Sequence, residues 1–155
     1  MSPAAPFTSF AGHMTALITS FRRDGTAVDT PVHIAFDGDR AFIRTYEAAW
    51  KTKRLRRRPE AELWHSSNGR EPAIAGLLTP NRARRTGRPL RVRAVELHGA
   101  DERLAATSIR RRYPVLQRLL IPLMHRSMRT RTVHFELVAT ADGVPETPDV
   151  ETTGA

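Results

Sequence analysis

Residues 14–45 read MTALITSFRRDGTAVDTPVHIAFDGDRAFIRT and contain three runs rich in Leu, Ile, Val, Phe and Thr. Such residues favour β-strands. Asp24-Gly25 separates the first two runs, and Asp37-Gly38-Asp39 separates the second from the third. Asp-Gly accommodates the positive φ that tight hairpin turns need. The pattern therefore predicts an antiparallel meander of three strands, over residues 14–21, 27–36 and 41–45.

The second run is interrupted by Thr30-Pro31-Val32. Proline has no N–H to donate and is confined to sheet edges, strand starts or bulges. We therefore expect this strand to be an edge strand, or to be bulged, at Pro31.

Residues 46–58, YEAAWKTKRLRRR, change the pattern, because they hold good helix formers and no turn residue. Pro59 ends the segment. Thr45 is expected to be the N-cap, and Glu47 in the first turn would favour the helix dipole.

The rest of the chain predicts a mainly β fold of the α+β class, an antiparallel barrel, closed or split, with flanking helices. Further strands are expected at 61–64, 73–78, 90–97 and 132–138, and a mobile basic loop at 81–87. Helices are expected from Asp101 through residue 112 and from Pro114 onward. We divide the chain into a flexible arm at 1–12, a domain at 13–139 and an acidic disordered tail at 140–155.

The amino-acid composition limits the classes of partner and active site that the protein can have. The 25 Lys and Arg residues against 16 Asp and Glu give a net charge of +9, which favours an anionic partner. The absence of cysteine excludes disulfides, thiol nucleophiles and Cys-ligated metals. The longest apolar run, 119–124, is short and broken by Pro122, and no secretion signal is recognisable. We therefore expect a cytoplasmic protein with no membrane span.

Several catalytic motifs are missing from the sequence. The glycines form neither a dinucleotide-binding fingerprint nor a P-loop, and no nucleophile elbow is present. The 6 histidines show no spacing typical of a metal site. We therefore predict no metal, and no catalytic residue can be assigned.

Basic residues gather where the third strand leads into the first helix. A helix N-terminus exposes backbone N–H groups that favour phosphate, and Lys51 lies close enough to add its charge. At 3.6 residues per turn, four side chains share one helix face while Leu55 faces away as an anchor. The candidate set is Arg44, Thr45, Trp50, Lys51, Lys53, Arg54 and Arg57. A solvated helix face, in a chain whose bases are almost all arginine, is the alternative.

Five pieces of this sequence, in order, resemble a known family. They are residues 21–26 (FRRDGT), Thr30-Pro31-Val32, Asp37-Gly38-Asp39, Arg44-Thr45, and residues 51–57 (KTKRLRR) followed by Pro59. Together they resemble the deazaflavin-dependent oxidoreductases of the pyridoxamine 5'-phosphate oxidase-like group, over roughly residues 14–64. That resemblance implies a split β-barrel of the FMN-binding type. It also implies a homodimer with coenzyme F-420 at the subunit interface.

The resemblance also implies roles for the candidate residues. Thr30, Pro31 and Val32 would line the deazaflavin ring, and Arg44, Thr45, Lys51 and Lys53 would hold the phosphodiester and the first acidic groups. Arg54 or Arg57 would reach the glutamate tail. Trp50 departs from the family, where smaller residues are usual, and would cap or narrow the phosphate pocket. The reaction would be hydride transfer between the cofactor and a small organic substrate. This chain departs from the family at His33, where an aromatic residue is common.

Two alternatives stay open. The first is a relative that binds flavin mononucleotide (FMN), or that binds a cofactor without turnover; relatives in this superfamily also bind heme. The second is a nucleic-acid-binding module that uses the arginines of residues 54–58, 82–85 and 110–112. Only 6% of the residues are aromatic and no reading motif is present, so nucleic acid is the less favoured partner.

Overall fold

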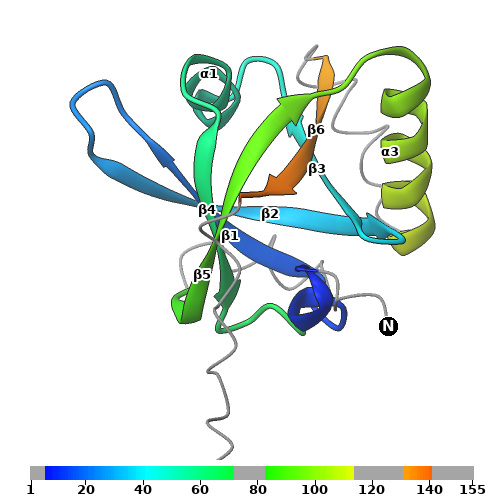
Figure 1. The fold of residues 1–155 in the computed structure, drawn as a ribbon, viewed down its shortest axis with the longest axis horizontal. Helices are drawn as coiled ribbons and strands as arrows, with labels where there is room; N and C mark the ends of the chain where they lie inside the picture. Colours follow the sequence, from blue (N-terminus) through cyan, green and yellow to red (C-terminus); the bar gives the residue numbers. More distant parts are fainter. Residues whose placement is uncertain (1–5, 72–82, 114–130, 141–155) are drawn as a thin grey trace, which may run out of the picture.

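The computed structural model describes residues 6–71, 83–113 and 131–140, and its six strands form a closed antiparallel barrel (Figure 1). Around the barrel the order is β1-β2-β3-β6-β5-β4. The strands are β1 (Thr15–Phe21), β2 (Ala27–Asp37), β3 (Arg40–Tyr46), β4 (Glu60–Ser66), β5 (Arg85–Glu96) and β6 (Thr132–Ala139). The helices are η1 (Thr8–Phe10), α1 (Trp50–Arg57) and α3 (Gly99–Arg112). The expected mainly β barrel with flanking helices is confirmed.

The two Asp-Gly turns form as the sequence predicted. Gly25 and Gly38 adopt φ of 86° and 59°, a conformation that glycine reaches without strain. The Asp24 carboxylate accepts a 2.9 Å hydrogen bond from the backbone N–H of Thr26 and so closes the first turn. The β1–β2–β3 meander is confirmed.

Pro31 occupies an edge, as expected. β2 pairs with β1 along residues 27–33, and its pairing with β3 begins only at Ile34. In this stretch β2 therefore has a single partner strand among the described residues, and a residue without an N–H donor is tolerated there.

The barrel interior is closed by side chains from both of its ends. Leu55 of α1 and Phe10 of η1 each expose 1% of their surface and belong to the same core cluster as the inward residues of the strands. In Figure 1, α1 and η1 lie on opposite sides of the barrel. Within the stretch expected to be a flexible arm, Phe7 is 4% exposed and Phe10 1%, and both rings belong to the core.

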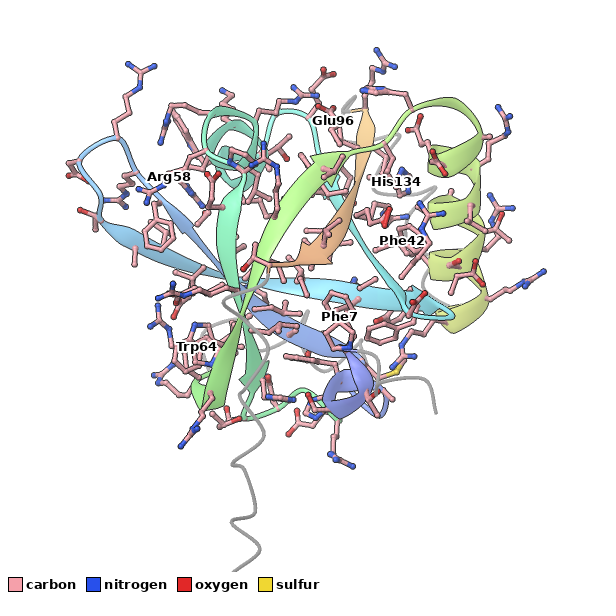
Figure 2. All side chains as sticks on the ribbon, viewed as in Figure 1. Phe7, Phe42, Arg58, Trp64, Glu96 and His134 are labelled. Carbon is pink, nitrogen blue, oxygen red and sulfur yellow. The ribbon has the colours of Figure 1, made fainter. Side chains whose placement is uncertain are left out.

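A second apolar layer lies outside the barrel. α3 packs on the outer side of β2, β3 and β6. Figure 2 shows Phe42 and His134 in the layer between these strands and α3. The residues of this layer are Ala35, Phe42, Leu97, Ala105, Ile109 and Tyr113.

The expected helix starts were wrong. β3 continues to Tyr46, which pairs with Thr132 of β6, so α1 begins at Trp50 with Ala49 as its N-cap. Thr45 therefore lies within a strand and is no cap, and α1 has no acidic residue in its first turn. Similarly, α3 starts after His98, and Asp101 lies in its first turn. Strand pairing outweighed the local helix propensity in the first case.

The prediction of a mobile basic loop at 81–87 was wrong for residues 85–87, which belong to β5. Arg85 and Thr86 pair with Ser66 and His65, so β5 is longer than the apolar pattern indicated. The expected strand at 73–78, the helix from Pro114 and the tail from residue 141 lie outside the described residues.

Candidate functional site

The junction between β3 and α1 is held by two threonines. The Thr52 hydroxyl donates a 2.6 Å hydrogen bond to the backbone oxygen of Tyr46 and also bonds to the Thr45 hydroxyl. Both threonines are buried, at 2% and 0% exposure. Because side chains alternate along a strand, the inward position of Thr45 puts Arg44 on the outer side of the barrel. Thr45 thus positions the helix start and keeps its hydroxyl inside.

Arg44 lies between two histidines on neighbouring strands. It is the register partner of His134 on β6. On the other side, His33 of β2 comes directly before Ile34, where pairing with β3 begins, and the charge of Arg44 acts on its ring. This row of His33, Arg44 and His134 crosses the outer face of three strands beside α3.

His33 is held neutral by its surroundings. Burial, with the charges of Arg44 and Lys51 adding to it, lowers the pKa of His33 to about 4. The His33 ring also packs against the ring of Tyr113 at a centroid distance of 5.0 Å. We call His33, Arg44 and Lys51 the basic cluster.

Lys51 is the unusual cation of this cluster. Burial, together with repulsion by Arg54, lowers the pKa of Lys51 to about 8. Within residues 6–71, 83–113 and 131–140, no ion pair links Lys51 to a carboxylate. Burial also lowers the pKa of Arg44, and Tyr46 opposes that shift. A desolvated ammonium without a carboxylate is costly, and an anion beside Lys51 would offset that cost.

The start of α1 adds backbone donors to the basic cluster. Ala49 provides no side-chain cap, and the first turn holds no acidic residue. The first N–H groups of a helix have no partner within the helix and favour an anion. Donor set and charge therefore both fit a phosphate beside Lys51.

The remaining candidates on α1 form two groups. Trp50 is 73% exposed, and the Lys53 ammonium lies 4.7 Å from the centre of its ring. Arg54 donates a 2.7 Å hydrogen bond to Ser20 Oγ, and Arg57 donates a 3.0 Å bond to the Phe21 backbone oxygen. These two arginines extend positive charge from Lys51 to the end of β1.

The three residues expected to line a ring divide between two sides of β2. Val32 is 3% exposed and lies in the barrel core. Thr30 shares its side of the strand, whereas Pro31 shares the outer side with His33. The structure therefore brings Pro31 and His33 to the face of the basic cluster and keeps the Val32 side chain apart from it.

Sequence reasoning missed two residues of this region. Tyr113 donates a 2.7 Å hydrogen bond from its hydroxyl to the backbone oxygen of Ile34, one residue from His33. His134 Nδ1 lies 3.5 Å from Glu102 Oε1, and burial lowers the pKa of His134 despite Glu102. Both reach the site through pairings of distant segments, for which a single sequence carries no signal.

Neither a metal-binding group nor a membrane-spanning helix is found among the described residues. They contain no group of three or more metal-ligating side chains. Among their helices, none combines the length and the apolar character needed to cross a membrane.

The barrel is similar to several solved structures. No family model matches the chain, and no curated protein matches it. A heme binding protein from Mycobacterium smegmatis superposes with a TM-score of 0.58 at 12% identity, covering 90% of this chain and 53% of that one. The heme storage protein HutZ from Vibrio cholerae gives 0.56 at 13% identity, covering 90% and 92%. A candidate pyridoxamine 5'-phosphate oxidase from Listeria innocua gives 0.50 at 12% identity, covering 84% and 86%.

The fold is the split β-barrel of the pyridoxamine 5'-phosphate oxidase-like proteins. At these identities the likeness shows the fold alone. Within the split barrel, the basic cluster lies on the outer face of β2 and β3, against the start of α1.

Proposed function

We propose that this split-barrel protein binds a phosphate-bearing redox cofactor of the flavin or deazaflavin class at the basic cluster. The observation that carries the proposal is Lys51, a half-buried cation whose pKa is lowered to about 8, which lies at an uncapped helix start and acts together with Arg44 on His33. Buried charges in proteins are normally paired, and a phosphate would supply the missing partner.

Arg44, Lys51 and the first N–H groups of α1 would hold the phosphate. Thr45 acts indirectly, because its hydroxyl bonds to Thr52 and fixes the start of α1. Pro31 and His33 would lie along the ring on the outer face of β2. The bound cofactor supplies hydride chemistry, and the protein supplies position and charge. The finer proposal is hydride transfer between coenzyme F-420 and a small organic substrate.

The Arg54 and Arg57 track favours F-420 over FMN. Both arginines are held at the end of β1, beyond Lys51, by their bonds to Ser20 and Phe21. A ligand with a phosphate and a longer acidic tail would use them, whereas FMN ends at its phosphate. FMN, with or without turnover, is the alternative.

A homodimer belongs to the same proposal. Trp50 is 73% exposed at the start of α1, next to Lys51, so this end of the proposed site is open. A second protomer or the cofactor itself would cover it.

Heme is a second candidate ligand, favoured by two observations. Neighbours of this fold include a heme binding protein and a heme storage protein. The neutral imidazole of His33 is the form that ligates iron, and Arg44 and Lys51 would pair with propionates.

Nucleic acid is less favoured, because ion pairs already engage part of the arginine charge. Arg56 binds Glu96 at 2.6 Å, and Arg85 binds Asp29 at 2.5 Å.

The test is a side-by-side titration of the purified protein with F-420, FMN and hemin, followed by quenching of ligand fluorescence and by heme absorbance. We expect saturable binding of F-420. Lys51→Ala should raise the Kd about tenfold or more, since it removes a buried charge contact. Lys53 was expected to share the phosphate, but its exposed ammonium lies over the Trp50 ring. Lys53→Ala is therefore the matched control and should change the Kd by less than about threefold.

Equal effects of the two substitutions would contradict the assignment of the phosphate to Lys51. Saturable binding of hemin, with neither F-420 nor FMN bound, would replace the flavin proposal with the heme one.

A further inference from the structure

His33 is a neutral base placed among cations. It comes directly before Ile34, the first β2 residue paired with β3, whose partner Ile43 comes directly before Arg44. The charges of Arg44 and of Lys51, on α1, act on its ring. Both charged groups that act on its ring are positive, and both disfavour its protonation. The protonation state of His33 therefore depends on the net charge between Arg44 and Lys51.

The other groups around His33 stay neutral or act at a distance. On β1 its register partner is Thr15. After α3, the Tyr113 ring packs on it, and burial raises the pKa of Tyr113 to about 12. On β6, His134 lies on the far side of Arg44, within 3.5 Å of Glu102.

An anion at the basic cluster would offset the positive charge that acts on His33. With the basic cluster alone, a third positive charge would meet two like charges and a desolvation cost. A phosphate between Arg44 and Lys51 offsets those charges and offers an acceptor for an imidazolium N–H. The same event that binds the ligand therefore favours a proton on His33.

We propose that binding of a phosphate-bearing ligand at the basic cluster is coupled to the uptake of one proton from solvent by His33. This inference rests on the proposed function and names the regulation of the same site. By linkage, a group that gains a proton on binding makes the affinity rise as the pH falls. His33 is thus a third cationic contact that forms only with the ligand in place.

The test follows the imidazole of His33 by NMR in the wild-type protein, with and without saturating F-420 or FMN. We expect the His33 resonance to titrate at a pH about two and a half units higher in the complex, near the ordinary imidazole value, because a smaller shift would leave His33 unprotonated above about pH 5.5. In parallel, the wild-type Kd should fall about tenfold more than the Kd of His33→Gln between about pH 7.5 and pH 5.5. Comparing the two proteins cancels the titration of the FMN phosphate, whose second pKa is about 6.

His98→Gln is the matched control, because it removes an exposed imidazole at the start of α3 and should keep the wild-type pH profile. An unmoved His33 titration in the saturated complex would overturn the proposal, and so would a shift confined to His134. The proposed function would survive either result. If neither F-420 nor FMN bound at all, the proposed function would fail and the coupling with it. The wild-type NMR titration decides the matter even if His33→Gln does not fold.

Discussion

The hydroxyl of Thr52, in the first turn of α1, donates a 2.6 Å hydrogen bond to the backbone oxygen of Tyr46, the last residue of β3. The same hydroxyl meets that of Thr45 in the barrel wall. A strand and a helix are thus joined at the point where Arg44 and Lys51 converge. The site is therefore only as rigid as this buried junction.

Replacing Thr52 with valine tests the junction, because valine keeps the shape and removes the hydroxyl. The Tyr46 oxygen and the Thr45 hydroxyl each lose one hydrogen bond but keep the 3.2 Å bond between them, so the free energy of unfolding should fall by about 1 kcal/mol. Urea unfolding measures this directly. Lys53→Ala, one residue further along on the exposed side, should change it by less than about 0.5 kcal/mol. A Thr52→Val protein as stable as the wild type would show that the junction contributes nothing.

The alkaline pH dependence of cofactor binding should come from Lys51. Burial lowers the pKa of Lys51 to about 8, and a bound anion would raise it again. Binding strength from this group is therefore complete below the free pKa and is lost as the pH rises through and beyond it. We expect the Kd for F-420 to increase about tenfold between about pH 7 and pH 9.5.

Replacing Lys51 with arginine keeps the positive charge but removes the group that titrates in this pH range. Lys51→Arg should flatten the alkaline part of the profile, because guanidinium stays protonated throughout this range. Lys53→Arg, the control on the same helix, should leave the profile as in the wild type. An alkaline loss of affinity that persists unchanged in Lys51→Arg would assign it to another group.

Local chemistry predicted much of the β-meander. The Asp24-Gly25 turn and the edge position of Pro31 each follow from one or two residues with special backbone requirements. The start of α1 was wrong because Tyr46 is held in β3 by Thr132, a partner from the distant strand β6. A helix propensity that is correct locally gave way to that pairing.

The candidate site likewise combines residues that the local sequence predicted with residues that it did not predict. Arg44 and Lys51 follow from the strand-to-helix pattern, and the structure brings both to the environment of His33. Tyr113 and His134 arrive from other elements, and no local periodicity links them to residue 33 or 44. Long-range register is the information that a single sequence lacks.

Arg85, the first residue of β5, is paired with Asp29 of β2. Arg85 binds both Asp29 oxygens, from Nε at 2.6 Å and from Nη2 at 2.5 Å. Chiefly because of this hydrogen bonding, the pKa of Asp29 is lowered. A carboxylate with a depressed pKa stabilises the fold above its unfolded-state value, and this stability is lost as the pH falls through the folded-state pKa.

Asp29→Asn should therefore destabilise the protein near pH 7 and cost less in acid. Since about a third of each side chain is exposed, solvent screening limits the expected loss to about 0.5–1 kcal/mol. Urea unfolding at about pH 7 and pH 3 gives the comparison, with the difference from wild type shrinking at the lower pH. Glu60→Gln removes the more exposed partner of Arg93 and is the control. A difference that grows in acid would reverse the sign and refute the argument.

Gly69 is required by close packing under η1, and substitution there should be costly. A Cβ at this position would lie 2.5 Å from His13 Nδ1 and 2.7 Å from the Thr15 backbone oxygen, and the backbone atom has little room to move. The Gly69 oxygen also accepts a 2.6 Å hydrogen bond from the Met14 N–H, so a shift would strain the start of β1. Gly69→Ala should lower the free energy of unfolding by about 1–3 kcal/mol. Gly12→Ala is the matched control, because its Cβ would meet only the flexible end of Arg70 at 3.5 Å, and equal losses in thermal or urea unfolding for the two variants would show that the crowding at Gly69 is relieved at no cost.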